Sequence, residues 1–176
     1  MKSLFRVARR VFLAVGVLFC LGFAWPQRFV MPVEGAGRSS FHPESFWYHP
    51  WGRSVTHKGV DIFARKGTPV RAATSGLVVF TGELGMGGRV ALVLGPRWRM
   101  HYYAHLERID VARGHWLRPG ERLGTVGATG NARGKPPHLH YTIGTLVPLP
   151  WQVCPGPHGL RRMWYVDPTP LLNGAS

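Results

Sequence analysis

The sequence predicts a mainly β fold, in which antiparallel sheets form an open groove between irregular Pro/Gly-rich flanks, with a short C-terminal helix. The 23 Gly and 15 Pro residues make up about a fifth of the 176 residues, against a usual share of about 12%. This excess favours short strands with tight turns over a helical bundle. The expected strands are joined by connections too short for a parallel crossover, so neighbouring strands should be antiparallel.

The first 25 residues are expected to direct export. Four basic residues among the first ten precede an uninterrupted apolar run from Val11 to Trp25, which is 15 residues long and stops at Pro26. A basic segment followed by an apolar one is typical of an export signal. A membrane-spanning helix needs about 20 apolar residues, so this run is short for an anchor. Residues 1–25 are therefore either a cleaved signal or a retained membrane anchor. Either alternative places the protein in the cell envelope, periplasmic or anchored to the cytoplasmic membrane.

The exported part divides into an irregular lead-in, residues 26–50, and one domain, residues 51–172. The turn Gly95-Pro96 should form a hairpin. Asp167-Pro168 should start a short terminal helix that closes at Asn173-Gly174. Apolar segments bounded by turn residues predict strands over 69–71, 76–82, 89–94, 99–105, 122–126 and 138–144.

The chain is strongly basic, with 22 Lys and Arg against 8 Asp and Glu and a formal net charge of +14. Part of this charge belongs to the export segment. The remainder still predicts an anionic partner, which could be a nucleic acid, a membrane surface or an acidic cell-wall polymer. So few carboxylates argue against a calcium-binding array. Two cysteines, Cys20 in the apolar run and Cys154, do not make a disulfide framework.

The histidines that indicate chemistry lie in three short segments, residues 57–61, 101–105 and 138–140. A spacing of two residues on a strand puts His138 and His140 on one face. His57 and Asp61 can reach one ion if the chain bends at Gly59. Two imidazole nitrogens and one carboxylate oxygen form a usual catalytic zinc shell, with the fourth position left to water. The three segments together therefore predict a metal site.

These segments belong to a longer series of motifs in a fixed order. The series is His57-Lys58-Gly59-Val60-Asp61-Ile62-Phe63-Ala64, Gly67-Thr68-Pro69-Val70, Gly76 with Val78, Tyr102-Tyr103-Ala104-His105-Leu106, Gly120, Gly124, Gly127-Ala128-Thr129-Gly130-Asn131 and Pro137-His138-Leu139-His140. In this series, which covers roughly half of the chain, the protein resembles the lysostaphin-like zinc endopeptidases. This LytM-type family cuts peptide bridges of bacterial peptidoglycan. Residues 165–168 are also similar to the usual end of the family's domain.

The resemblance implies a role for each matching residue. It makes His57, Asp61 and His140 the ligands of one zinc ion per domain. It gives His105 and His138 the places of two active-site histidines that bind no metal. Zinc lowers the pKa of a bound water from 15.7 to about 7, and free histidines are suited to moving protons near neutral pH. Either His105 or His138 can be the general base.

Tyr103 and Asn131 are the candidate substrate-binding residues. Tyr103 is the best candidate among several aromatic residues whose simpler role is packing in the sheet. Asn131 lies just before the metal-bearing strand and could position the substrate backbone, although a plain turn also explains it. His101 shares a strand face with Tyr103 and His105, and a rim or structural role is expected for it.

The predicted function is hydrolysis of the peptide cross-links of peptidoglycan by metal-activated water with histidine acid/base assistance. Peptidoglycan peptide stems and cross-links are the expected partners, and a regulatory protein partner is compatible with this function. Nucleic acid is not expected, because the export signal and the lack of an evident basic and aromatic ladder argue against it. The alternative is a non-catalytic peptidoglycan-binding or amidase-activating protein on the same fold.

Overall fold

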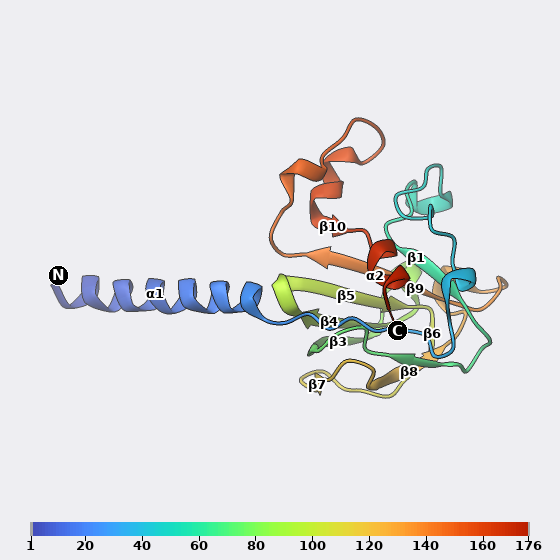
Figure 1. Ribbon diagram of the computed structural model, residues 1–176, viewed down its shortest axis with the longest axis horizontal. Coiled ribbons are helices and arrows are strands. Elements are labelled where there is room, and N and C mark those ends of the chain that lie inside the picture. The colour runs from blue at the N-terminus through green and yellow to red at the C-terminus, as the bar shows by residue number, and fades with distance from the viewer. Residues whose placement is uncertain (1, 176) are drawn as a thin grey trace.

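The computed structural model describes residues 2–175 and confirms the mainly β, antiparallel fold. Figure 1 shows helix α1 (Lys2–Ala24) projecting from a β domain, with the short helix α2 (Thr169–Asn173) next to the C-terminus. The strands are β1 (Val60–Phe63), β2 (Pro69–Arg71), β3 (Gly76–Glu83), β4 (Arg89–Gly95), β5 (Arg99–Ala104), β6 (Leu106–Ile109), β7 (Trp116–Leu117), β8 (Arg122–Val126), β9 (His138–Thr145) and β10 (Tyr165–Val166).

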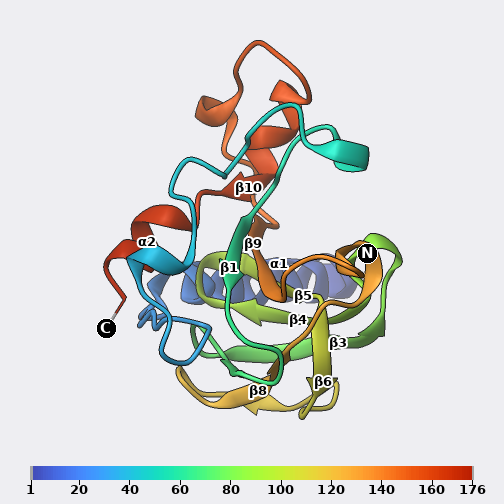
Figure 2. The same cartoon turned by 90° about the vertical axis from the view of Figure 1, so that its right-hand side faces the viewer.

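The strands form two sheets. The larger sheet has the order β1-β9-β5-β4-β3-β7, with β10 also paired to β9, and the smaller one has the order β2-β8-β6. Figure 2 shows β6 and β8 of the smaller sheet on one side of β3, β4 and β5. Apolar side chains of both sheets form one buried cluster, as expected for two packed layers. Its members include Ile62, Val70, Val78, Val93, Leu106, Leu123, Val126 and Tyr141.

The six expected strands are all present, and their ends differ by one residue at most. Strands β1, β6, β7 and β10, of two to four residues each, were not expected, because segments this short carry a weak pattern that is easily missed. The strand expected over 99–105 ends at Ala104, since His105 adopts a left-handed conformation with φ of 62°. The helix expected from Asp167 begins at Thr169, whose backbone N–H donates to Oδ1 of Asp167 at 2.9 Å.

The lead-in is attached to the edge of the smaller sheet. The N–H of Glu34 donates to the carbonyl of Pro69 at 3.1 Å, and the N–H of Arg71 donates to the carbonyl of Pro32 at 2.8 Å. Between these bonds, the side chain of Val33 is fully buried in the core. The lead-in therefore contributes to the packing of the β domain.

Helix α1 contains a 20-residue stretch, Phe5–Ala24, that is long and apolar enough to cross a membrane. None of its most apolar window is buried against the β domain. A signal sequence near the N-terminus passes the same test of length and composition. Both alternatives for this segment, export signal and membrane anchor, therefore agree with its structure.

The core can be tested at Tyr103, a fully buried residue whose hydroxyl accepts a hydrogen bond from the N–H of Ala73 at 2.9 Å. Tyr103→Phe leaves that buried N–H without a partner, so we expect the free energy of unfolding to fall by about 1–3 kcal/mol. Tyr102→Phe, at the half-buried neighbour, should change it by less than about 0.5 kcal/mol. Urea unfolding of both variants measures the difference, and equal losses would contradict this account of the core.

Candidate metal centre

The pairing of β1 with β9 places Asp61 directly opposite His140. Residues opposite each other in an antiparallel pair have neighbouring side chains. His57 precedes β1 and approaches β9 through Gly59. A Cβ atom at Gly59 would lie 2.4 Å from Oγ1 of Thr142 and 2.5 Å from the carbonyl oxygen of Tyr141. Glycine is therefore required here for the His57 segment to pass this close to β9.

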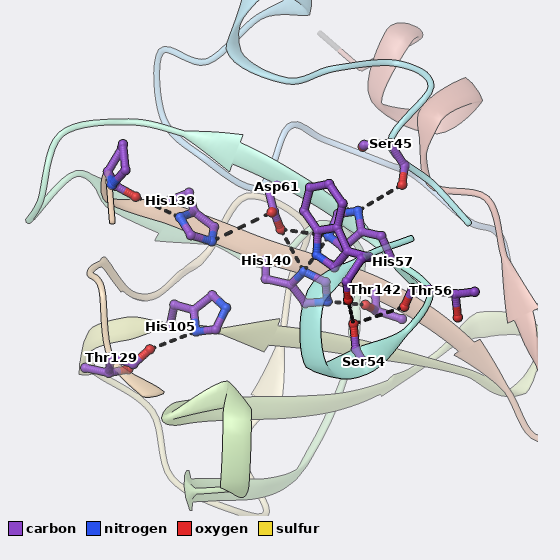
Figure 3. A network of polar contacts seen from close by, with 12 residues as sticks. Ser45, Ser54, Thr56, His57, Asp61, His105, Thr129, His138, His140 and Thr142 are labelled. Carbon is purple, nitrogen blue, oxygen red and sulfur yellow. Dashed lines mark hydrogen bonds and ion pairs between the residues drawn. The ribbon is translucent and has the colours of Figure 1, made fainter. Parts of the chain in front are cut away.

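Three side chains converge on one point, as Figure 3 shows. Oδ1 of Asp61 lies 2.7 Å from Nδ1 of His140 and 3.0 Å from Nε2 of His57. The two imidazole nitrogens are 3.1 Å apart. These three ligand atoms are close enough together to hold one metal ion.

Neighbouring oxygens orient the two imidazoles. Nδ1 of His57 donates to the carbonyl of Ser45 at 2.9 Å. A carbonyl only accepts, so Nδ1 carries a proton. Nε2 faces Asp61, where it can donate to the carboxylate when protonated and present a lone pair to a metal ion when not. Nε2 of His140 lies 3.1 Å from Oγ1 of Thr142, which can accept its proton and leave Nδ1 as the ligand atom. Hydrogen bonds of this kind fix the tautomer of metal-binding histidines.

The cluster is shielded from solvent, with exposed side-chain fractions of 2% for His57, 15% for Asp61 and 19% for His140. Burial alone would raise the pKa of Asp61. Hydrogen bonds to His140 and His57, together with the charges of these residues, outweigh burial and hold the pKa of Asp61 well below its usual range. Burial lowers the pKa of His140, against the opposing influence of Asp61. The site therefore favours an ionised Asp61 carboxylate and a neutral His140 imidazole.

This set of donors fits zinc. Catalytic zinc sites take three protein ligands from imidazole nitrogen, carboxylate oxygen or thiolate sulfur and keep one position for water. Calcium instead takes about six to eight oxygen ligands, which this site does not offer. Three electron-pair donors that face one another at 2.7 to 3.1 Å repel unless a cation or a shared proton lies between them. A divalent cation satisfies all three donors at once.

Two further histidines lie beside the cluster. Nδ1 of His138 donates to the carbonyl of Pro136 at 2.8 Å, and Nδ1 of His105 donates to the carbonyl of Thr129 at 2.9 Å. Their ring centroids are 5.0 Å apart. Nε2 of His138 lies 3.8 Å from Oδ2 of Asp61. In both rings a backbone carbonyl holds the Nδ1 proton, so Nε2 is the atom available for proton transfer.

His105 occupies a special backbone position between β5 and β6. Its φ is 62°, a backbone conformation that residues other than glycine rarely adopt. Its N–H donates to the carbonyl of Gly87 at 2.8 Å. Burial lowers the pKa of His105 to about 4, and repulsion from His140 and His138 acts in the same direction. Backbone strain of this kind is concentrated at functional sites.

The cluster forms part of the wall of a groove with a volume of about 760 Å³. Trp51 lines the groove and stacks on His57, with ring centroids 4.3 Å apart and an angle of 27° between the planes. Asn131 also lines it, in the region expected from the sequence. The remaining wall is largely apolar and includes Phe63, Met86, Met100, Tyr102 and Tyr165.

The structure does not bring Tyr103 to this groove, in contrast to the expectation from the sequence. Tyr103 belongs to the buried core, and its neighbour Tyr102 lines the groove together with His105. Strict alternation along a strand over 99–105 would put Tyr103 and His105 on one face. The left-handed conformation at His105 interrupts that alternation and turns its side chain to the side of Tyr102.

The sequence did not point to three groups that contact His57 or His140 in the structure. Trp51 and the Ser45 carbonyl reach His57 through a loop, and no local spacing marks them. Thr142 continues the two-residue alternation of β9, and that periodicity is the signal that could have found it. His101 lies in the core rather than in the groove, with Nδ1 2.6 Å from the hydroxyl of Tyr141.

Comparison with known proteins places these residues in a family. Residues 55–147, more than half of the chain, match the model of peptidase family M23. The chain is 40% identical over 93 residues to the DD-carboxypeptidase/endopeptidase Mpg of Neisseria meningitidis, a match covering 53% of this chain and 20% of that protein. It is 34% identical over 113 residues to the peptidoglycan DD-endopeptidase ShyA of Vibrio cholerae, covering 64% of this chain and 26% of that protein.

The fold agrees with this match. The catalytic domain of lysostaphin from Staphylococcus simulans superposes with a TM-score of 0.60 at 27% identity, covering 73% of this chain and 88% of that domain. The chain spans only a fifth to a quarter of the length of the two curated relatives. The match to the family model includes all five residues of the metal cluster and the adjacent histidine pair. On these grounds, the chain belongs to peptidase family M23.

Proposed function

We propose that this protein is an exported, zinc-dependent endopeptidase that hydrolyses peptide cross-links of bacterial peptidoglycan. The observation that carries this proposal is the convergence of His57, Asp61 and His140 beside His105 and His138 on the wall of a largely apolar groove. Family M23 is zinc-dependent, and both curated relatives described above are endopeptidases by name. A peptide lying in the groove would pass directly over the metal cluster.

His57, Asp61 and His140 would hold the zinc ion. When bound, zinc polarises the scissile carbonyl and lowers the pKa of a water ligand to about 7. Nε2 of His105 and Nε2 of His138 divide the proton transfers. An unprotonated Nε2 would take a proton from the attacking water, and an Nε2 that carries a proton would give it to the nitrogen of the leaving amine. Hydrolysis consumes one water and yields one new carboxylate and one new amine.

The substrate backbone would lie along the groove walls. Asn131 offers an amide that can both donate to and accept from a peptide backbone. Tyr102 and Trp51, which line the groove, offer aromatic surfaces for the substrate side chains. We therefore assign substrate binding to Asn131 and Tyr102, with Tyr102 in the role that the sequence suggested for Tyr103.

Each segment of the chain has a proposed role that agrees with a location in the cell envelope. Residues 1–25 would act as the export signal or membrane anchor, residues 26–50 as the lead-in that packs on the domain, and residues 51–172 as the endopeptidase domain. The protein would then work in the cell envelope beside an acidic wall. The positive charge that lies outside the export segment, which is most of the formal net charge of +14, favours association with such a polymer.

Substitutions separate metal binding from proton transfer. His140→Ala or Asp61→Ala removes one of three ligands, so we expect loss of bound zinc and of hydrolysis. His138→Ala keeps all three ligands, so it should retain zinc while hydrolysis falls by about 10²–10⁴-fold. Metal analysis of the purified variants and release of peptides from isolated sacculi measure the two effects.

The control for these variants is His42→Ala, at an exposed histidine of the lead-in, which should keep both zinc and activity. Hydrolysis that persists in the His140→Ala variant would contradict the proposal. Zinc binding without any hydrolysis in the wild-type protein would instead favour a non-catalytic peptidoglycan-binding or amidase-activating protein on the same fold.

Removal of the metal should stop the reaction without unfolding the protein. The core is built from apolar side chains of both sheets, so the fold does not depend on the ion as a small zinc finger does. We expect a chelator to abolish hydrolysis, added zinc to restore it, and circular dichroism to remain unchanged throughout. Unfolding on chelation would show that the ion is structural, and full activity in excess chelator would exclude zinc catalysis.

A further inference from the structure

The last turns of α1 pack against the tip of the hairpin between β4 and β5, the turn η4 (Pro96–Trp98). Nε1 of Trp98 donates to the carbonyl of Phe19 at 3.0 Å. The two rings are stacked, with centroids 6.4 Å apart and 13° between their planes. A Cβ atom at Gly22 would lie 2.4 Å from the Trp98 ring. The helix and the hairpin therefore meet closely through a glycine.

The chain that follows α1 is also attached to the domain. Trp25 packs edge-to-face on Trp116 of β7, with ring centroids 5.7 Å apart. Oε1 of Gln27 accepts a hydrogen bond from Nη1 of Arg99 at 2.9 Å. These contacts follow directly on the helix and leave no free linker between α1 and the sheets. The direction of the helix relative to the β domain is thus set by specific contacts.

These contacts gather three tryptophans at the end of an apolar helix. Trp25 and Trp116 are 49% and 50% exposed, and Trp98 is partly exposed. Tryptophan prefers the boundary between lipid and water, and basic side chains prefer anionic head groups. Exposed basic residues lie within three positions of each tryptophan along the chain, at Arg28, Arg97 and Arg113. An aromatic and basic surface directly beyond a membrane-length helix matches the chemistry of a bilayer interface.

We propose that Trp25, Trp98 and Trp116 form a membrane-seated foot, which rests in the head-group layer of the bilayer that α1 spans. This proposal rests on the export part of the proposed function, with α1 retained as an anchor. A cleaved signal has no use for contacts to the mature domain, whereas a retained anchor gains a fixed orientation from them. The partner of this surface is the lipid bilayer itself.

The foot would hold the candidate metal centre at a fixed distance from the membrane surface. Strand β5 starts beside the hairpin tip at Arg99 and ends at Ala104, which is paired with His140. Five residue steps at about 3.3 Å each make about 17 Å. Figure 1 shows β5 extending away from α1 along nearly the same direction. Cleavage would then occur in the wall layer nearest to the membrane.

The test uses the full chain in vesicles of phosphatidylethanolamine and phosphatidylglycerol that contain shallow-brominated lipid, which quenches nearby tryptophan fluorescence. We expect strong quenching in the wild type and loss of most of it in the double variant Trp98→Phe with Trp116→Phe. Trp51→Phe, at the 39% exposed residue that stacks on His57 near the far end of β5, should leave the quenching in place. Equal quenching in the double variant and the wild type would overturn the proposal.

Two glycine variants test whether the contact of α1 with Trp98 holds the foot in the head-group layer. Gly22→Leu keeps α1 apolar but drives a side chain into Trp98, whereas Gly16→Leu meets nothing within 4 Å. Both should remain in the membrane, and Gly22→Leu alone should lose quenching. Equal quenching in the two variants, or an intact mass of the membrane protein that lacks α1, would overturn the proposal. Hydrolysis of sacculi in detergent tests the proposed function separately, because it does not require the foot.

Discussion

The antiparallel register of β9 with its two neighbours is the constraint on which the site depends. On one side β9 pairs with β1, so that Asp61 faces His140. On the other side it pairs with β5, so that the end of β5 delivers His105 beside the cluster. A slip of one residue would turn every side chain of β9 to the opposite face. His138 and His140 would then both leave the groove.

Loops around this strand complete the site through backbone carbonyls. Ser45, Thr129 and Pro136 each hold the Nδ1 proton of one histidine. Three of the four histidines at the centre therefore present Nε2 to the cluster or the groove, and their tautomers are set by main-chain geometry. Side-chain substitution does not remove these acceptors, so the site depends on the loop conformations as well as on the candidate ligands.

The sequence predicted those parts of the site that depend on local periodicity. The spacing of His138 and His140 on a strand, and the expected bend at Gly59 between His57 and Asp61, predicted that these side chains could meet, and their side chains do lie together in the structure. The resemblance implied which of them are the ligands. The sequence placed Tyr103 on the groove face of β5 together with His105, whereas it lies in the core. The left-handed conformation of His105, which breaks the alternation, has no signal in the sequence. Contacts made through long loops, such as that of Trp51 with His57, depend on tertiary packing and carry no local signal.

The central claim is that two imidazoles and one carboxylate bind a single zinc ion. The most direct measurement is the zinc K-edge X-ray absorption spectrum of the purified wild-type protein, together with its zinc content. The account predicts one zinc per chain, in a shell of two imidazole nitrogens, one carboxylate oxygen and one further light atom. A protein that binds no zinc, or a spectrum with a sulfur ligand, would contradict it.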